Sequence, residues 1–114
     1  MNNTIQDKSF HFAVRIVNLC KYLQQETHEY IIYKQLFRCG TSIGANVAEA
    51  QQAQSKADFV SKLSISLKET TETKYWIKLL KATDYLSETE YGSIFSDCVE
   101  IEKILVTIIK TTKE

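Results

Sequence analysis

The chain has 114 residues, with 14 basic and 14 acidic side chains, three cysteines and no proline. This length fits one domain, residues 1–114, and a content of 44% hydrophobic and 25% charged residues is that of a globular protein, which excludes a disordered chain. A net charge of zero argues against a generally basic nucleic-acid-binding protein, although it leaves room for a local basic patch.

Targeting signals and metal-binding motifs are not evident. No apolar run approaches the ~20 residues of a membrane helix, and residues 1–7 lack the basic and apolar regions of a secretory signal, so we expect a cytoplasmic protein with no membrane association. Cys20, Cys39 and Cys98 form no CxxC motif, and we expect them to be buried free thiols. His11 and His28 have no partner at metal-ligand spacing, so we expect neither a metal nor another cofactor.

Apolar residues recur at steps of three and four along four segments, which predicts four helices. The expected helices cover residues 9–25, 30–52, 55–83 and 88–112, joined by short polar links. At the start of the third helix, Ser55 and Asp58 resemble a capping box with aspartate in place of the usual glutamate. A capping box of Ser87 and Glu90 begins the fourth helix. One continuous helix over residues 30–82 is the alternative, but it would far exceed the mean helix length of about 11–12 residues. We therefore predict an all-α, antiparallel up-down-up-down four-helix bundle.

The middle of the second helix is rich in small residues. Gly40 and Gly44 stand four positions apart, and each glycine costs a helix about 1 kcal/mol relative to alanine. Small side chains let another helix approach closely, which would compensate that cost. We therefore predict a close helix contact at Gly40 and Gly44.

A polar line runs along the same helix. Its members follow steps of three and four residues and share one face: Gln35, Arg38, Ser42, Asn46 and Glu49. One interpretation is a solvated face; the other is a contact face for a ligand or a further subunit, which the flanking small residues favour. Together with Gly44, these residues form the predicted oligomer contact face.

Enzymatic motifs are missing from the sequence. It contains no Glu-x-x-His pair for a di-iron bundle, no Walker glycine loop, no GxSxG and no HExxH, so we expect a protein without catalytic residues. An enzyme acting on a small ligand would need a pocket that sequence does not reveal.

A second candidate surface lies on the third helix. Lys74, Lys78 and Lys81 lie beside Tyr75 and Trp76, and lysines interleaved with aromatic residues can bind nucleic acid. Lysines in the last turns of a helix also complement its dipole, which is the structural interpretation of the same pattern.

The segment from Gln35 to Ala50 resembles the hallmark segment of the bacterial four-helix bundle proteins called 23S rRNA intervening-sequence proteins. The similarity continues through Ser55–Phe59, Leu63–Glu69 and Glu72–Trp76, and so covers nearly the whole chain. Ala50 departs from the glycine that the family often has after the glutamate of the second helix, which would let this helix run on slightly.

The resemblance implies a small bundle without established catalytic residues. The family is similar to the accessory variability protein of diversity-generating retroelements, a pentameric barrel that binds a reverse transcriptase and nucleic acid. By this analogy we expect a homopentamer that acts as a scaffold or adaptor for an unidentified protein or RNA partner. The alternative is an RNA- or DNA-binding accessory protein that uses the lysine and aromatic patch, although the neutral charge of this chain makes that role fit poorly.

Overall fold

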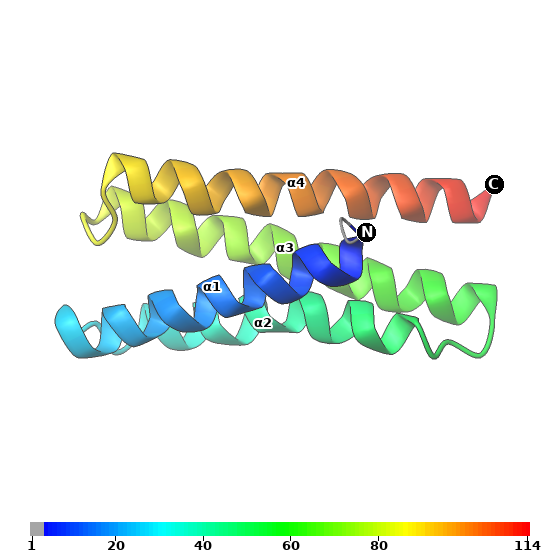
Figure 1. The fold of residues 1–114 in the computed structure, drawn as a ribbon, viewed down its shortest axis with the longest axis horizontal. Helices are drawn as coiled ribbons and strands as arrows, with labels where there is room; N and C mark the ends of the chain where they lie inside the picture. Colours follow the sequence, from blue (N-terminus) through cyan, green and yellow to red (C-terminus); the bar gives the residue numbers. More distant parts are fainter. Residues whose placement is uncertain (1–3) are drawn as a thin grey trace.

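Four antiparallel helices make up the computed structural model, which describes residues 4–114. They are α1 (Ile5–Glu26), α2 (Ile32–Ala50), α3 (Lys56–Ala82) and α4 (Glu88–Lys113). Each helix packs along the next one in the sequence, and of the four pairs of adjacent helices α1 and α4 contact each other least (Figure 1). This arrangement confirms the predicted all-α four-helix bundle.

Serine side chains begin α3 and α4 where the sequence predicts. The hydroxyl of Ser87 accepts a hydrogen bond from the backbone N–H of Glu90, whose carboxylate accepts in return from the N–H of Ser87. Ser55 caps α3 by accepting from the N–H of Asp58, and this confirms the predicted break before α3. The Asp58 carboxylate, being shorter than a glutamate, accepts from the N–H of Gln54 instead.

Some predicted helix ends are corrected. The first helix begins at Ile5 rather than at residue 9, because the hydroxyl of Thr4 accepts a hydrogen bond from the N–H of Asp7 and caps an earlier turn. The second helix ends at Ala50 rather than 52, since the N–H groups of Gln51 and Gln52 bond to carbonyls three residues back in a tightened last turn. The fourth helix begins at Glu88 as predicted, and the remaining ends differ from the prediction by one or two residues.

Glu29 explains why α2 begins at Ile32 rather than at residue 30. Its carboxylate is buried and accepts hydrogen bonds from the backbone N–H groups of Ile31, Ile32 and Tyr33, at 3.0, 2.7 and 2.7 Å. His28 precedes it with φ of 59°, a left-handed backbone that turns the chain between α1 and α2. An acceptor for three free N–H groups replaces the usual cap residue at this end.

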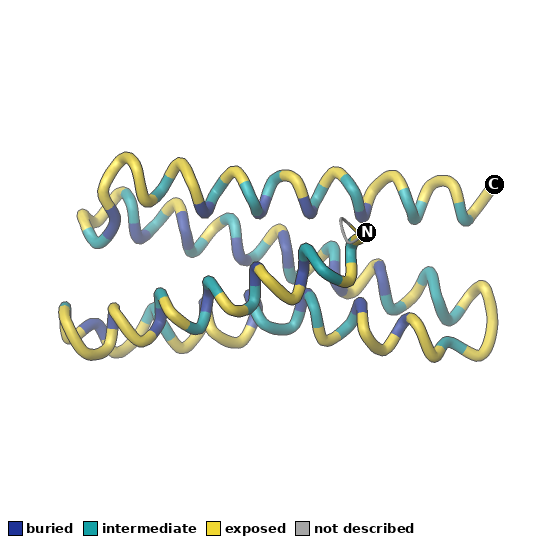
Figure 2. Tube along the Cα trace, viewed as in Figure 1, coloured by how far each residue is buried: buried dark blue, intermediate teal, exposed yellow. Residues whose placement is uncertain are grey.

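The core is a continuous apolar column between the four helices, visible as the dark positions on their inner sides (Figure 2). Leu86, in the link before α4, closes one end of it, and Trp76 packs partly buried against it. The three cysteines are free and buried, as predicted. Burial raises the pKa of the Cys20 and Cys98 thiols to about 12 and that of Cys39 to about 11. None of the helices described has an apolar stretch long enough to cross a membrane.

The glycines of α2 allow α1 to pack closely on it. A Cβ atom added at Gly40 would lie 2.8 Å from Cγ1 of Ile16, and one added at Gly44 would lie 3.2 Å from the carbonyl oxygen of Ser9. Ile16 and Ser9 are both buried. The prediction that glycine brings another helix close is therefore confirmed within the chain.

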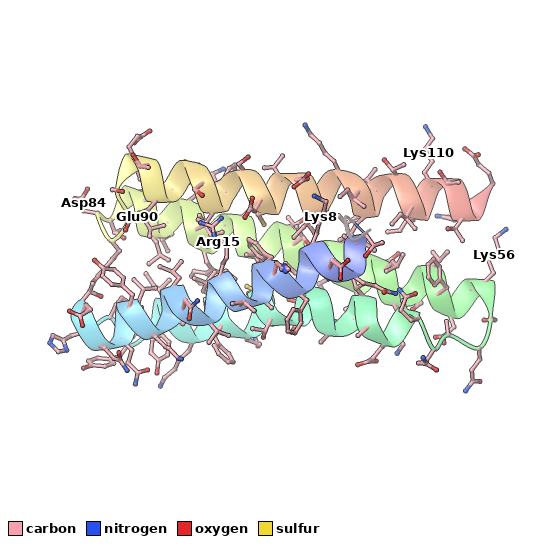
Figure 3. All side chains as sticks on the ribbon, in the orientation of Figure 1. Lys8, Arg15, Lys56, Asp84, Glu90 and Lys110 are labelled. Atoms are coloured by element: carbon pink, nitrogen blue, oxygen red, sulfur yellow. The ribbon has the colours of Figure 1, made fainter. Side chains whose placement is uncertain are left out.

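Two ion pairs join α1 and α4. Lys8 pairs with Glu100 at 3.0 Å, and Arg15 pairs with Asp97 at 2.6 Å. Lys8 and Arg15 lie on the side of α1 that faces α4 (Figure 3). Since α1 begins part-way along the bundle, the last turns of α4 continue past it (Figure 1). The α1–α2 pair is thus a tightly packed hairpin with a looser edge toward α4.

Candidate functional site

The predicted polar line follows the edge where α2 meets α3. The guanidinium of Arg38 donates to the carboxylates of Glu69, at 3.4 Å, and Glu72. Glu49 pairs with Lys62 of α3 at 3.4 Å. Much of the charge on this line is therefore neutralised within the chain.

Two other members of the polar line donate hydrogen bonds to backbone carbonyls of α2 itself. The Ser42 hydroxyl donates to the carbonyl of Arg38 at 2.6 Å, and the Asn46 side-chain amide donates to the carbonyl of Ser42 at 2.9 Å. Gln35 is exposed. Gly44 lies on another side of α2, against α1, so the structure does not gather all six predicted residues on one face. A role for these residues in subunit contact stays a prediction.

Trp76 contacts the same Glu72 carboxylate that pairs with Arg38, a contact that was not predicted from the sequence. Its indole N–H donates to the Glu72 carboxylate at 3.0 Å. This hydrogen bond, and then the one from Arg38, hold the pKa of Glu72 below its ordinary value, while Glu72 raises the pKa of Arg38. The four-residue spacing of Glu72 and Trp76 on α3 is the signal that would have indicated this pair.

The lysine patch on α3 is mostly neutralised. Lys74 pairs with Glu102 at 2.9 Å, and Lys81 pairs with Glu88 at 2.9 Å, which raises the pKa of Lys81. Of the three lysines, only Lys78 has no ion-pair partner within residues 4–114. A patch presenting one unpaired cation does not favour the nucleic-acid alternative, because affinity for phosphates grows with the number of cations.

The most distinctive surface is a groove between α1 and α2 that the sequence analysis missed. This α1–α2 groove has a volume of about 590 Å³, and its floor and walls are mostly small or apolar. Its lining consists of Gln6, Phe10, Ala13, Thr41, Gly44, Ala45, Val47, Ala48 and Gln51. The signal for it was present in Thr41, Ala45 and Ala48, which stand on one outward side of α2 at steps of four and three.

Large apolar side chains are exposed at the α1–α2 groove and beside it: Phe10 lines the groove, Val14 follows the lining residue Ala13, and Phe37 stands one helical turn before the lining residue Thr41. Phe10 is 67% exposed, and Val14 and Phe37 are each 45% exposed. No Asp, Glu, Lys or Arg occurs from residue 9 to 14 or from residue 39 to 48. This outer face of the α1–α2 hairpin, which we call the uncharged face, is thus hollowed, apolar and bordered by exposed phenylalanines.

No group of three or more His, Cys, Asp or Glu side chains is placed to hold a metal ion in the part of the chain that the structure describes. The cavity between α1 and α4 that His11 lines, of about 280 Å³, is bordered by the Lys8–Glu100 ion pair. The uncharged face is therefore the candidate interaction surface of the described residues.

Comparison with known proteins assigns the family. Residues 1–107 match the family described as 23S rRNA-intervening sequence protein. The chain belongs to this family. The resemblance noted in the sequence is thereby confirmed.

A solved structure to which this chain is similar has the same fold. It is described as a protein with unknown function from the S23 ribosomal protein family of Bacteroides thetaiotaomicron VPI-5482. It is 55% identical, with a TM-score of 0.93 over 94% of this chain and 99% of that one. A search of curated proteins finds no match. The five-membered assembly implied by the resemblance remains a prediction.

Proposed function

We propose that this member of the 23S rRNA-intervening sequence protein family is a non-enzymatic, cytoplasmic scaffold or adaptor that assembles with copies of itself. One observation carries the proposal: the uncharged face presents exposed Phe10, Val14 and Phe37 around an apolar groove. Exposed apolar patches of this kind mark interaction surfaces on soluble proteins. The pentamer implied by the resemblance supports a second copy as the partner.

The use of charged side chains supports a structural rather than a catalytic role. Lys8, Arg15, Lys74 and Lys81 join neighbouring helices or helix ends through ion pairs. Glu29 serves a helix end instead. These groups hold the bundle together.

Light scattering coupled to size-exclusion chromatography tests self-association. We expect the wild-type protein at micromolar concentration to have a multiple of the 13.1 kDa chain mass, five chains if the resemblance holds. Phe10→Ser should lower the mass, because it removes an exposed aromatic ring from the uncharged face. Tyr75→Ser, at a 59% exposed position on α3, is the matched control and should keep the wild-type mass. A wild-type protein that stays monomeric contradicts the proposal.

A further inference from the structure

We propose that the groove between α3 and α4, at the C-terminal end of α4, binds an acidic amphipathic helix of a partner protein. This α3–α4 groove has a volume of about 420 Å³. Its lining consists of Leu67, Val106, Ile109, Lys110, Lys113 and Glu114. The inference rests on the proposed adaptor role and deepens it by naming a second surface and the chemistry of its partner. None of the lining residues belongs to the uncharged face.

The last turns of α4 are covered less than the rest of the helix. Of the described helices, only α1 and α3 lie beside α4, and α1 begins part-way along the bundle (Figure 1). Beyond that point α3 is the only neighbouring helix. Val106, two turns before the end of α4, is 48% exposed, and Ile109 is only partly buried. The chain thus carries apolar side chains to a place where its own helices leave a hollow.

The α3–α4 groove combines aliphatic and cationic side chains. Leu67, Val106 and Ile109 supply its apolar lining. Lys110 follows Val106 by four residues and Lys113 follows Ile109 by four, so each lysine lies one turn beyond an apolar lining residue on the same side of α4. Lys110 points away from the bundle (Figure 3). An occupant of the groove would therefore contact aliphatic side chains and ammonium groups together.

The carboxylates of α4 are engaged within the chain, whereas its lysines are not. Glu90 serves the capping box, and the other carboxylates of the helix make ion pairs with α1 or α3: Glu88, Asp97, Glu100 and Glu102. In contrast, Lys103, Lys110 and Lys113 make no ion pair within residues 4–114. The helix dipole accounts for lysines in the last turn of α4, but not for Lys103, ten residues before its end. A chain of zero net charge thus presents a local positive surface at this groove, where Glu114 is the only lining carboxylate.

An acidic amphipathic helix is complementary to this combination. A helix laid into a groove buries one apolar stripe, and glutamate or aspartate beside that stripe would face the lysines, since opposite charges across an interface favour the correct partner. Both walls are helices, so the groove has no free strand edge to which an extended peptide could add. The stretch from Lys103 to Lys113 spans about 15 Å, which matches about three turns of a bound helix. Nucleic acid fits less well, because no aromatic residue lines the groove to stack on a base.

A pair of synthetic peptides tests the chemistry of the partner. The first is a fluorescent helical peptide with leucines at positions i, i+4 and i+7 and glutamates on either side of that stripe. The second is the same peptide with lysine in place of every glutamate. Fluorescence anisotropy measures the affinity of each peptide for the full chain. We expect the acidic peptide to bind at least about tenfold more tightly than the basic one, and its affinity to fall as salt is raised, because salt screens the lysines.

Val106→Asp tests the apolar part of the groove. It puts a carboxylate on the lining at a half-exposed position, so the bundle should fold while the acidic peptide binds at least about tenfold more weakly. Ile65→Asp is the matched control, because Ile65 is 41% exposed on α3 but does not line the groove. This control should bind the acidic peptide like the wild type. Circular dichroism checks the helicity of every variant.

Reversing two lysines tests the charge of the groove. Lys103→Glu combined with Lys110→Glu should weaken binding of the acidic peptide roughly tenfold and strengthen binding of the basic peptide by a similar factor. Lys21→Glu combined with Lys34→Glu is the control, which changes the net charge equally on α1 and α2. Neither of these residues lines the groove, so both affinities should stay within about twofold of the wild type.

The outcomes separate a protein partner from nucleic acid. Weaker binding of the acidic peptide by both groove variants, with both controls unchanged, supports the inference. An acidic peptide that does not bind, or that binds every variant equally, refutes it. Single-stranded oligouridylate is a second probe. RNA binding that depends on the lysines but not on Val106, without peptide binding, would assign the groove to nucleic acid and overturn the inference.

Light scattering separates this inference from the proposed self-association. A Val106→Asp variant with a lower mass than the wild type would show that a second copy covers the groove, which also overturns the inference. A monomeric wild type that binds the acidic peptide refutes self-association and supports the partner helix. An assembled wild type that does not bind the peptide refutes the partner helix and leaves self-association intact.

Discussion

Replacing Gly40 by alanine tests the close packing of α1 on α2. The new Cβ atom would lie 2.8, 2.9 and 3.1 Å from three side-chain carbons of Ile16, which is fully buried. Carbon atoms pack best at about 3.5–4.0 Å, so Ile16 has to move within a close-packed core. Gly40→Ala should therefore destabilise the protein even though alanine is the better helix former.

The magnitude follows from two opposing terms. Adding a methyl group to a well-packed core costs typically about 1–3 kcal/mol, while alanine in place of a helical glycine recovers about 0.5–1 kcal/mol. The net loss is about 1 kcal/mol, in a range of roughly 0–2.5 kcal/mol. Gly92→Ala is the matched control: no atom lies within 4 Å of its added Cβ, so it should stabilise by about 0.5–1 kcal/mol.

Urea unfolding at one fixed protein concentration measures both variants, because the proposed self-association would make stability depend on concentration. The Gly40→Ala variant should unfold at lower urea than wild type, and the Gly92→Ala variant at higher urea. Combining Gly40→Ala with Ile16→Ala should show a coupling of about 0.5–3 kcal/mol, since truncating Ile16 removes the clash. If Gly40→Ala stabilises as much as Gly92→Ala and shows no coupling, α1 and α2 do not touch as described.

Other parts of the fold give shorter tests. Glu29→Ala should lose about 1–2 kcal/mol of unfolding free energy in the same urea experiment, since three N–H groups at the start of α2 lose their acceptor; an unchanged midpoint would contradict its capping role. The three buried thiols should react with a thiol reagent at pH 8 only at the rate of unfolding, because their raised pKa values keep them protonated; labelling as fast as a free thiol would contradict this. Because the thiols of the unfolded chain ionise from about pH 9 while the native ones ionise near 11–12, their contribution to stability should fall as pH rises through that window. Arg15→Met should cost at most about 1 kcal/mol, since the Arg15–Asp97 pair is partly exposed; a larger loss would show that α1 depends on α4.

Local signals in the sequence account for most of the fold. The Ser87–Glu90 capping box fixes the start of α4 because both hydrogen bonds form within one turn. Apolar periodicity identifies the buried residues of α1 and α4 for a similar reason, since each core position follows from the helix repeat. Thr4 and Asp7 also formed a readable cap, and overlooking it placed the first helix four residues late.

Features that depend on distant or irregular parts of the chain are harder to predict from the sequence. Glu29 caps α2 from a turn with a left-handed residue, and glutamate in such a turn gives no helix-start signal. The polar line on α2 was found from its spacing, but its ion pairs with Glu69 and Glu72 depend on how α3 packs beside it. Likewise the α1–α2 groove arises from two helices at once, so α2 alone showed small residues without showing which of them line a hollow.

The small residues of α2 serve two different sides of the helix. Gly40 and Gly44 face α1, and packing within the chain explains them. Thr41, Ala45 and Ala48 line the outside of the hairpin, where folding of the single chain would tolerate longer and charged side chains equally well. A lysine or glutamate at these positions would leave the bundle intact but would fill the groove and charge its floor. The outward small residues therefore need an explanation beyond the stability of one copy, and the proposed self-association would supply one, because small side chains let a second backbone approach closely.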